Sequence, residues 1–378
     1  MSPPRTVSPA STRPAWSEVD LGAVAANYRE VRRRVRPGVR IIASIKANAY
    51  GHGAVEVARA LTAEGADWLA TGSFDEAVAV REAGVETPIL LFAGGVPDAM
   101  GDVVRAGFVP TVYGLDSARA VSAAARGSTS VWIKVDAGLG RLGVPLQEAE
   151  AFARAVAELP NVLVEGLYTH LPFVDAAGRE WASKRLSAFQ ALAERLVRAG
   201  LPLSFTQALS SAGILAGLED DSSAVCPGHI LYGLPPASAE IADMSPFRPA
   251  LRAVKTRLIH VSTHREVRTA GIGGRIRLPA GAGTGVVPFG RTDGYRAHLE
   301  GRQAFMLAGG QRVSVRGVSL EHTTLDLTGV EVAVGDEVVV LGEQGDETIS
   351  ASEIADWQSA HVDDVVLAFD RHTARSYV

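Results

Sequence analysis

Residues 40–53 read RIIASIKANAYGHG, in which a short, mostly apolar run ends at Lys46 and two glycines follow. A run of this length, bounded by turn residues, is typical of a buried β-strand. Residues 53–63 then place Ala, Val and Leu at helical spacing, and a second apolar run occupies 67–71. A strand, a helix and another strand in succession predict a parallel sheet with covering helices.

The same alternation extends from Pro14 to about Pro235. Eight apolar runs recur there, at 40–45, 67–71, 88–92, 109–113, 131–135, 163–168, 204–209 and, more weakly, 223–226. Helix-like segments lie between them, at 53–63, 75–83, 117–125, 146–158 and 181–199. Eight such units over roughly 220 residues match the size of a (β/α)8 TIM-type barrel, although a doubly wound sheet has the same pattern. We expect a barrel over residues 15–240.

The remainder of the chain has a different pattern. Short, often β-branched runs are separated by turns that contain Gly and Asp, at 258–261, 284–288, 303–307, 312–318, 324–327 and 337–341. One helix-like stretch begins near Ser350. These features predict a C-terminal, mostly antiparallel β domain over residues 241–378. Residues 1–14, rich in Ser, Pro and Arg, are expected to be disordered.

Composition and charge exclude several classes of protein. Hydrophobic residues make up 47% of the 378 residues and charged residues 21%, the balance of a folded, soluble chain. The 37 Lys and Arg are outnumbered by 42 Asp and Glu, which argues against a nucleic-acid partner. No apolar run reaches membrane-spanning length. A single cysteine, Cys226, excludes an internal disulfide and fits a reducing compartment, so we expect a cytoplasmic protein.

Lys46 is the first candidate for chemistry, because the active site of a parallel barrel lies at the C-terminal ends of its strands. It closes the first run and is one of only four lysines in the chain. Arginine cannot lose its proton to become an amine nucleophile, so a lysine here indicates function rather than a surface cation. The fifth run leads into a glycine loop ending at Arg141, which suits a carboxylate or phenolate but equally an exposed turn.

The later strand ends carry further candidates. His170 follows the sixth run, Ser211 the seventh, and Gly228 and His229 the eighth. Small hydroxyl and glycine residues after the seventh and eighth strands are where barrels hold a phosphate group. A lysine nucleophile together with a phosphate site points to pyridoxal 5'-phosphate (PLP), held as a Schiff base.

These residues lie in motifs that resemble the alanine racemase family. The segment Lys46-Ala-Asn-Ala-Tyr-Gly-His-Gly53 is similar to the family's signature around the cofactor lysine. Further motifs follow in the same order: Lys134-Val-Asp-x-Gly-x-Gly-Arg-Leu-Gly143, Tyr168-Thr-His170, Ser211-Ala212, Pro227-Gly-x-x-x-Tyr-Gly233, Pro288-x-Gly-x-x-Asp-Gly-Tyr295, Gly317-Val-Ser-Leu-Glu321 and Val334-Gly-Asp-Glu-Val338. The resemblance extends over nearly the whole chain, from Trp16 to Tyr377.

The resemblance implies roles for the charged residues of the barrel. Lys46 would carry PLP and exchange a proton at the substrate Cα on one face of the cofactor. Arg141 would contact the cofactor phenolate and the substrate carboxylate, positioned by Lys134, which is carbamylated in some relatives. His170 would lie against the pyridine ring and its neighbours.

The resemblance also implies a cofactor-binding set. Tyr50, Ser211 and the backbone of Gly228 and His229 would hold the phosphate. Tyr232 belongs to the same motif as Gly228 and is expected at the same site.

Several positions depart from the family pattern, among them the family's Met-Asp pair, which reads Leu320-Glu321 here. Arg291 stands where relatives have the tyrosine that serves as the second acid and base, contributed by the partner subunit. Arginine stays protonated at any working pH and is a poor proton acceptor. Cys226 replaces the arginine that faces the pyridine nitrogen, which should make the ring a stronger electron sink. Arg371 falls where many relatives place a gate tyrosine, and two arginines in the pocket suggest a ligand with an additional acidic or polar group.

The sequence therefore predicts a PLP-dependent enzyme acting at the Cα of a small amino acid, in the first place a racemase or epimerase. One-base chemistry (an aldolase, dehydratase or decarboxylase) is the alternative, because Arg291 and Cys226 replace the family's Tyr and Arg. A non-catalytic PLP carrier is a third hypothesis, which the additional β domain disfavours. Because the Arg291 motif lies in the β domain and Lys46 in the barrel, we expect a homodimer with shared active sites. No metal site is indicated.

Overall fold

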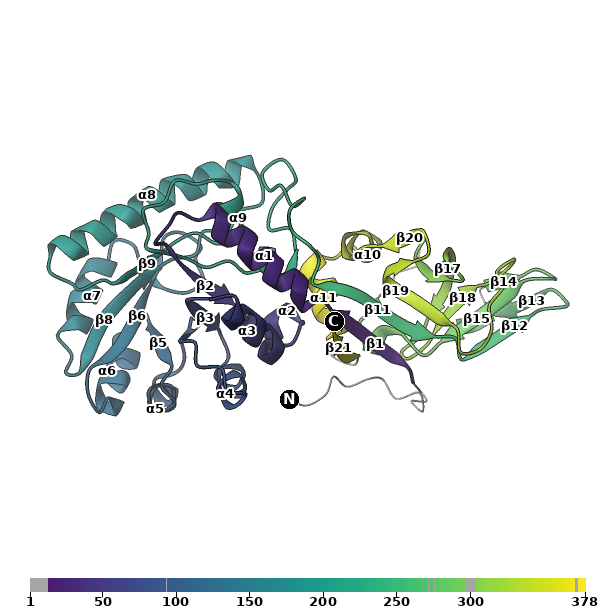
Figure 1. Ribbon diagram of the computed structural model, residues 1–378, viewed down its shortest axis with the longest axis horizontal. Helices are drawn as coiled ribbons and strands as arrows, with labels where there is room; N and C mark the ends of the chain where they lie inside the picture. The colour runs from purple at the N-terminus through teal and green to yellow at the C-terminus, as the bar shows by residue number, and fades with distance from the viewer. Residues whose placement is uncertain (1–12, 93, 271, 275, 297–302, 371–372) are drawn as a thin grey trace. The chain divides into compact units, whose positions relative to one another are not determined.

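The computed structural model describes residues 13–92, 94–270, 272–274, 276–296, 303–370 and 373–378 (Figure 1). The chain forms two compact units: Gly22–Arg248, and Met1–Leu21 together with Pro249–Val378. The first strand of the chain thus belongs to the same unit as the C-terminal third. This division differs from the expected boundaries at 15–240 and 241–378, which assigned that strand to the barrel.

The unit Gly22–Arg248 contains a closed barrel of eight parallel strands. The strands are β2 (Arg40–Ser44), β3 (Trp68–Thr71), β4 (Ile89–Leu91), β5 (Val109–Val112), β6 (Thr129–Asp136), β8 (Val162–Tyr168), β9 (Phe205–Gln207) and β10 (Ala224–Val225). They pair in the order β5-β4-β3-β2-β10-β9-β8-β6, and pairing of β5 with β6 closes the ring. Each strand overlaps one of the eight apolar runs. The predicted (β/α)8 fold is therefore confirmed, and the doubly wound alternative is wrong.

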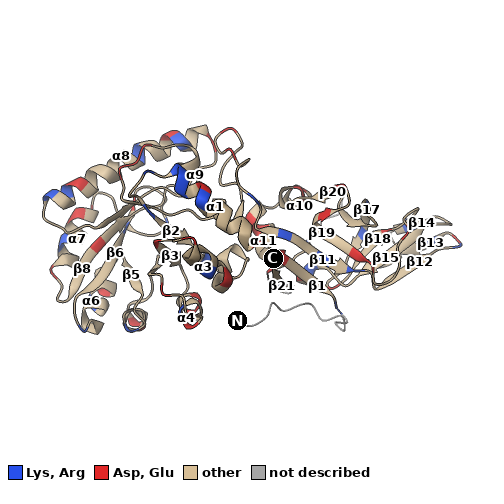
Figure 2. Ribbon diagram, in the orientation of Figure 1, with Lys and Arg blue, Asp and Glu red and all other residues tan. Residues whose placement is uncertain are grey.

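Helices cover the outside of this barrel (Figure 1). They are α1 (Leu21–Arg34), α3 (Ala54–Ala63), α4 (Phe74–Glu82), α5 (Met100–Arg105), α6 (Leu115–Ala124), α7 (Ala149–Ala157) and α8 (Ala176–Arg198). Two short segments, α2 (Lys46–Tyr50) and α9 (Ser211–Leu215), follow β2 and β9 at the C-terminal ends of these strands. Short 3-10 turns η1 (Pro97–Ala99) and η2 (His229–Tyr232) and the two-residue strand β7 (Val144–Pro145) complete the unit. Charged residues of both signs are spread along the long helix α8 (Figure 2), and its buried residues are all apolar, so its charged face turns to solvent.

Aromatic side chains fill the barrel interior. Trp132 is fully buried, and Phe205 and Trp68 pack against it with ring centroids 4.8 and 5.4 Å away. Ile42, Ala70, Leu90, Tyr168 and Ala224 complete this cluster. Strands buried on both faces need apolar side chains at nearly every position, which is why the sequence shows continuous runs rather than alternation.

The second unit is a mostly antiparallel sheet, as predicted. Its strands are β1 (Ala15–Val19), β11 (Leu251–Arg257), β12 (His260–Thr263), β13 (Arg268–Ala270), β14 (Ile276–Leu278), β15 (Gly283–Val287), β16 (Phe305–Ala308), β17 (Gln311–Val318), β18 (Thr323–Asp326), β19 (Glu337–Gln344), β20 (Glu347–Ile349) and β21 (Ala374–Tyr377). The main sheet runs β12-β15-β18-β17-β16-β19-β11-β1-β21. β1 pairs antiparallel with β11 and parallel with β21, so three strands absent from the sequence analysis form one end of the sheet.

Short helices accompany this sheet. α10 (Ala351–Gln358) begins after Ser350, whose hydroxyl accepts the backbone N–H of Glu353, as expected for the predicted helix. α11 (Val362–Phe369) and the 3-10 turns η3 (Ile272–Gly274) and η4 (Arg291–Asp293) were not predicted. Of the expected disordered segment 1–14, all but Arg13 and Pro14 lies outside the described residues, as does Arg371. Among the described helices none is long and apolar enough to cross a membrane.

Candidate active site

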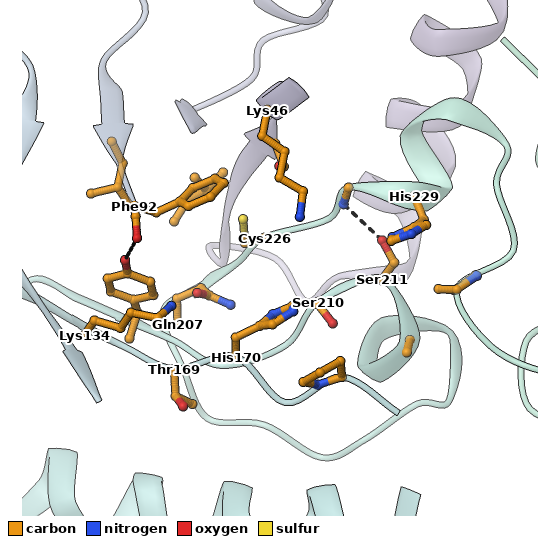
Figure 3. A pocket seen from close by; sticks show the side chains of 18 of the residues that line it. Lys46, Phe92, Lys134, Thr169, His170, Gln207, Ser210, Ser211, Cys226 and His229 are labelled. Atoms are coloured by element: carbon orange, nitrogen blue, oxygen red, sulfur yellow. Dashed lines mark hydrogen bonds between the residues drawn. The ribbon is translucent and has the colours of Figure 1, made fainter. Parts of the chain in front are cut away.

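A cavity of about 130 Å³ lies at the C-terminal ends of the barrel strands. Eight of the predicted site residues line it: Lys46, Tyr50, Arg141, His170, Ser211, Cys226, Gly228 and His229. They come from the ends of five different strands, and Figure 3 shows Lys46 and His170 reaching into the space from opposite sides of the view. Six of the eight were chosen because they follow apolar runs, and Tyr50 and Cys226 come from the family resemblance; the structure brings both sets to one cavity, and their roles stay predictions.

Lys46 begins an unusual turn. The backbone φ angles of Ala47, Asn48, Ala49 and Tyr50 lie between 52° and 54°, the left-handed region that L-residues rarely occupy. Strain of this kind persists only where surrounding contacts fix it, and it concentrates at functional sites. The turn reverses the chain immediately after β2 and brings the ring of Tyr50 to 5.3 Å from the Lys46 amine.

Glu76 of α4 holds this turn. Its carboxylate accepts the backbone N–H of Asn48 at 2.7 Å and the hydroxyl of Thr71 at 2.5 Å. The side chain of Asn48 in turn accepts the backbone N–H of Ala54 at 2.8 Å, which ties the turn to the start of α3. No motif marked Glu76, because it lies on a helix that the strand-end rule does not examine.

Tyr232 packs against Tyr50, which lines the cavity, without lining the cavity itself. It is fully buried and its ring lies 4.9 Å from the ring of Tyr50 and 4.8 Å from that of His52. Its hydroxyl donates a hydrogen bond to the carbonyl of Ser44 at 2.8 Å. Tyr232 thus orients Tyr50 rather than lining the cavity itself.

Ser211 and the segment after β10 form a corner suited to a phosphate. The Ser211 hydroxyl accepts the backbone N–H of Gly228 at 3.0 Å (Figure 3) and that of Ile230 at 3.4 Å. A Cβ added at Gly228 would overlap the Tyr50 hydroxyl, so only glycine lets these two groups meet. A serine hydroxyl, converging N–H groups and a tyrosine hydroxyl are donors that bind phosphate oxygens.

Cations dominate the electrostatics of the cavity. Its described lining includes Lys46, Lys134 and Arg141 but no Asp or Glu. Burial, together with the charge of Arg141, lowers the pKa of Lys134 to about 8, and its amine lies 4.4 Å from the ring of Tyr168. A set of cations without carboxylates is suited to a ligand with several negative charges.

Two cavity side chains are held neutral. Burial and then the charges of Lys134 and Lys46 lower the pKa of His170 to about 3, so its imidazole carries no charge at neutral pH. Burial raises the pKa of the Cys226 thiol to about 11.

The hydroxyl of Thr169, 1% exposed, has no hydrogen-bond partner among the described residues and lines the same cavity. A buried polar group in this state indicates that a ligand or water completes its bonding, so the residues present fit a phosphate-bearing ligand such as PLP.

The sequence analysis did not assign several lining residues. Ser44, Thr169, Gln207 and Ser210 all line the cavity. Thr169 and Ser210 directly follow apolar runs, so the rule that found Lys46 also picks them out. Ser44 and Gln207 end β2 and β9 but lie inside the predicted runs 40–45 and 204–209, so that rule passed over them. Arg291, by contrast, lies in η4 of the β unit, where its side chain is exposed.

A barrel with a lysine after its first strand and a phosphate-binding corner after its last two defines a class, the PLP-dependent enzymes built on a (β/α)8 barrel. The sequence profile described as "Alanine racemase, N-terminal domain" matches residues 19–236, and that described as "Alanine racemase, C-terminal domain" matches residues 251–377. The chain belongs to the alanine racemase family, which depends on PLP.

Relatives agree with this assignment over the whole chain. An alanine racemase of Syntrophobacter fumaroxidans is 35% identical over 345 residues, covering 90% of this chain and 91% of that protein. One of Desulfosudis oleivorans is 35% identical over 377 residues and covers 96% of both. The solved alanine racemase from E. faecalis has a TM-score of 0.88 at 29% identity, covering 98% of this chain and 99% of that one. These findings support the racemase hypothesis over one-base chemistry and over a PLP carrier.

Proposed function

We propose that this protein is a PLP-dependent amino-acid racemase or epimerase in which Lys46 carries the cofactor and moves a proton at the substrate Cα. The observation that carries the proposal is that the Lys46 amine and the Ser211–Gly228 corner line one cavity. PLP, when bound, acidifies the Cα–H of an amino acid by drawing electrons into its ring.

The other cavity residues suit binding and orientation. Tyr50, Ser211 and the N–H of Gly228 would bind the phosphate, and Arg141 would bind the substrate carboxylate as a two-pronged donor. His170 would lie against the ring as a neutral imidazole, because its pKa of about 3 keeps it uncharged at pH 7.

Racemisation also needs a proton donor or acceptor on the second face. We assign that face to a water held by Arg291 of the partner subunit, in a homodimer with shared sites, because the guanidinium itself stays protonated. The support is the position of Arg291 in the motif where relatives carry their second acid and base, and a twofold dimer completes two such sites at once. A fully active monomer in analytical ultracentrifugation would exclude this arrangement.

The substrate is expected to carry an acidic or polar side chain. Arg291 stays charged and accepts protons poorly, but it binds carboxylates well, so alanine itself should react slowly. The test is proton NMR of separate L- and D-amino acids incubated with the holoenzyme in deuterated water. Exchange and inversion of an acidic or hydroxylated amino acid, at rates well above those for alanine, support the proposal. A product lacking the Cα–Cβ bond or the carboxylate would refute racemisation.

Arg291→Tyr gives a complementary test. If Arg291 limits alanine turnover, restoring a tyrosine should raise interconversion of L- and D-alanine, and leave PLP binding by Lys46 unchanged. Rapid alanine racemisation by the unmodified enzyme would overturn the inference about the substrate.

We also propose a cytoplasmic location, because the lone Cys226 suits a reducing compartment.

A further inference from the structure

The loop that carries Arg291 is stabilised from a distant point in the chain. Asp293, two residues beyond Arg291, is fully buried. Arg13 donates to both of its carboxylate oxygens, Nη1 to Oδ1 at 2.9 Å and Nη2 to Oδ2 at 2.7 Å. Such a two-pronged bond fixes direction as well as distance, which a single ion pair does not.

The same carboxylate closes the loop. Oδ2 of Asp293 accepts the backbone N–H of Gly290 at 2.8 Å, and Asp293 N–H donates back to the Gly290 carbonyl at 3.1 Å. Arg13 Nη2 also lies 3.4 Å from the hydroxyl of Thr292 and 3.5 Å from the carbonyl of Glu321. Arg13 therefore contacts both the loop 290–295 and the neighbouring segment 319–322.

The loop packs tightly on that neighbouring segment. Arg291 N–H donates to the carbonyl of Ser319 at 3.1 Å, and Thr292 N–H to that of Leu320 at 2.9 Å. A Cβ at Gly290 would lie 2.6 Å from the Leu320 carbonyl oxygen, so no other residue fits there. The backbone on both sides of Arg291 is thus held by hydrogen bonds.

The side chain of Arg291, unlike its backbone, is not held by hydrogen bonds to the described residues. It is exposed, and among the described residues its guanidinium makes no hydrogen bond or ion pair. Because its backbone is fixed and its guanidinium is exposed, Arg291 is available to bind a ligand or another chain.

Arg13 is itself anchored. The carbonyl of the next residue, Pro14, accepts the hydroxyl of buried Thr256 at 2.7 Å, and β1, which begins at Ala15, is paired with β11 on one side and β21 on the other. Its side chain is 34% exposed, so the ion pair with Asp293 is shielded on one side only.

We propose that Arg13 is a positioning residue, which acts through Asp293 to hold the loop 290–295 in one conformation and so fixes where the exposed Arg291 meets an anionic group. Its effect on the loop is independent of the proposed racemase function. Its effect on turnover rests on that function, since it requires Arg291 to contact substrate.

Hydrogen–deuterium exchange of the holoenzyme tests the effect on the loop. All six backbone N–H groups of residues 290–295 are hydrogen-bonded. Arg13→Ala leaves a buried carboxylate with little compensation, so these amides should exchange about tenfold faster or more. Arg13→Lys keeps the positive charge but cannot form the two-pronged bond, so its exchange rate should lie between those of Arg13→Ala and the unmodified protein.

Arg312→Ala is the matched control. Arg312 lies in the same unit, is 31% exposed, and pairs with Glu347 and Glu353 well away in sequence from the loop. It should leave exchange in 290–295 unchanged. If the amides of residues 290–295 in Arg13→Ala exchange within twofold of their rates in the unmodified protein, the proposal is overturned. If Arg13→Ala does not fold, Asp293→Asn, which keeps shape but loses charge, replaces it in the same measurement.

A double-mutant comparison tests the effect on turnover. Arg13→Ala and Arg291→Ala should change kcat and KM in the same direction, and the double variant should be no worse than Arg291→Ala alone. Additive losses would show that Arg13 acts elsewhere and would overturn the link to Arg291. If Arg291→Ala itself left turnover unchanged, the assigned role of Arg291 would fail, while the exchange experiment would still decide the role of Arg13.

Discussion

Ala47→Gly offers a sharp test of the left-handed turn that follows Lys46. Ala47 has φ 52° and is exposed, so its methyl group contributes strain but little burial. An L-residue in this conformation costs about 1 to 2 kcal/mol, whereas glycine adopts it freely. Glycine also gives the unfolded chain about 0.4 to 1 kcal/mol more conformational freedom. The net expectation is a gain of roughly 0.5 to 1 kcal/mol in the free energy of unfolding.

The same substitution should have the opposite sign in an ordinary helix. Ala60 lies in the right-handed helix α3, and Ala60→Gly should cost about 1 kcal/mol. For a unit of this size, about 1 kcal/mol shifts the melting temperature by about 2 to 4 °C. We therefore expect a rise of about 1 to 4 °C for Ala47→Gly and a fall of about 2 to 4 °C for Ala60→Gly.

The assay is thermal unfolding of the PLP-free protein followed by tryptophan fluorescence, because Trp132 and Trp68 report on the barrel interior. Using PLP-free protein separates the backbone effect from cofactor binding. A fall in melting temperature for Ala47→Gly similar to that of Ala60→Gly would show that the turn is not strained and would refute the reasoning.

Three further outcomes are expected. Lys46→Ala should abolish the PLP adduct that borohydride reduces, and an adduct that survives would contradict the assignment of this lysine. Gly228→Ala, which pushes a methyl group onto the Tyr50 hydroxyl, should weaken PLP binding roughly tenfold or more, measured by absorbance titration. Below pH 6.5 the unfolded chain protonates His170 while the folded chain, with a pKa of about 3, does not, so the unfolding free energy should fall by up to about 3 kcal/mol between pH 6.5 and 4. Urea unfolding of PLP-free His170→Gln should show less of this loss; an identical pH dependence would assign it to other groups.

The barrel could be predicted because its pattern is local. β6 is the clearest case: the run at 131–135 falls inside the strand Thr129–Asp136, and the end of that run already placed Lys134 at the cavity. Continuous apolar runs mark strands buried on both faces, and the side chain that follows each strand reaches the same rim.

The features that escaped prediction depend on distant partners. No glycine marks the left-handed turn at 47–50, because Glu76 and the start of α3 hold it instead. β1 could be assigned to the β unit only through its pairing with β11, more than two hundred residues later. The sequence of α1 shows no clear apolar face, because Ala23 and Asn27 stand on its buried face in place of large apolar residues.

The position of β1 between β11 and β21 has a consequence for biosynthesis. In the finished sheet β1 lies between β11 and β21, and both of these strands are synthesised after the whole barrel. The barrel, encoded in between, can fold as a unit during translation, while β1 must wait with both edges unpaired. Nascent chains that stop before β21 should therefore contain a folded barrel and an incomplete sheet.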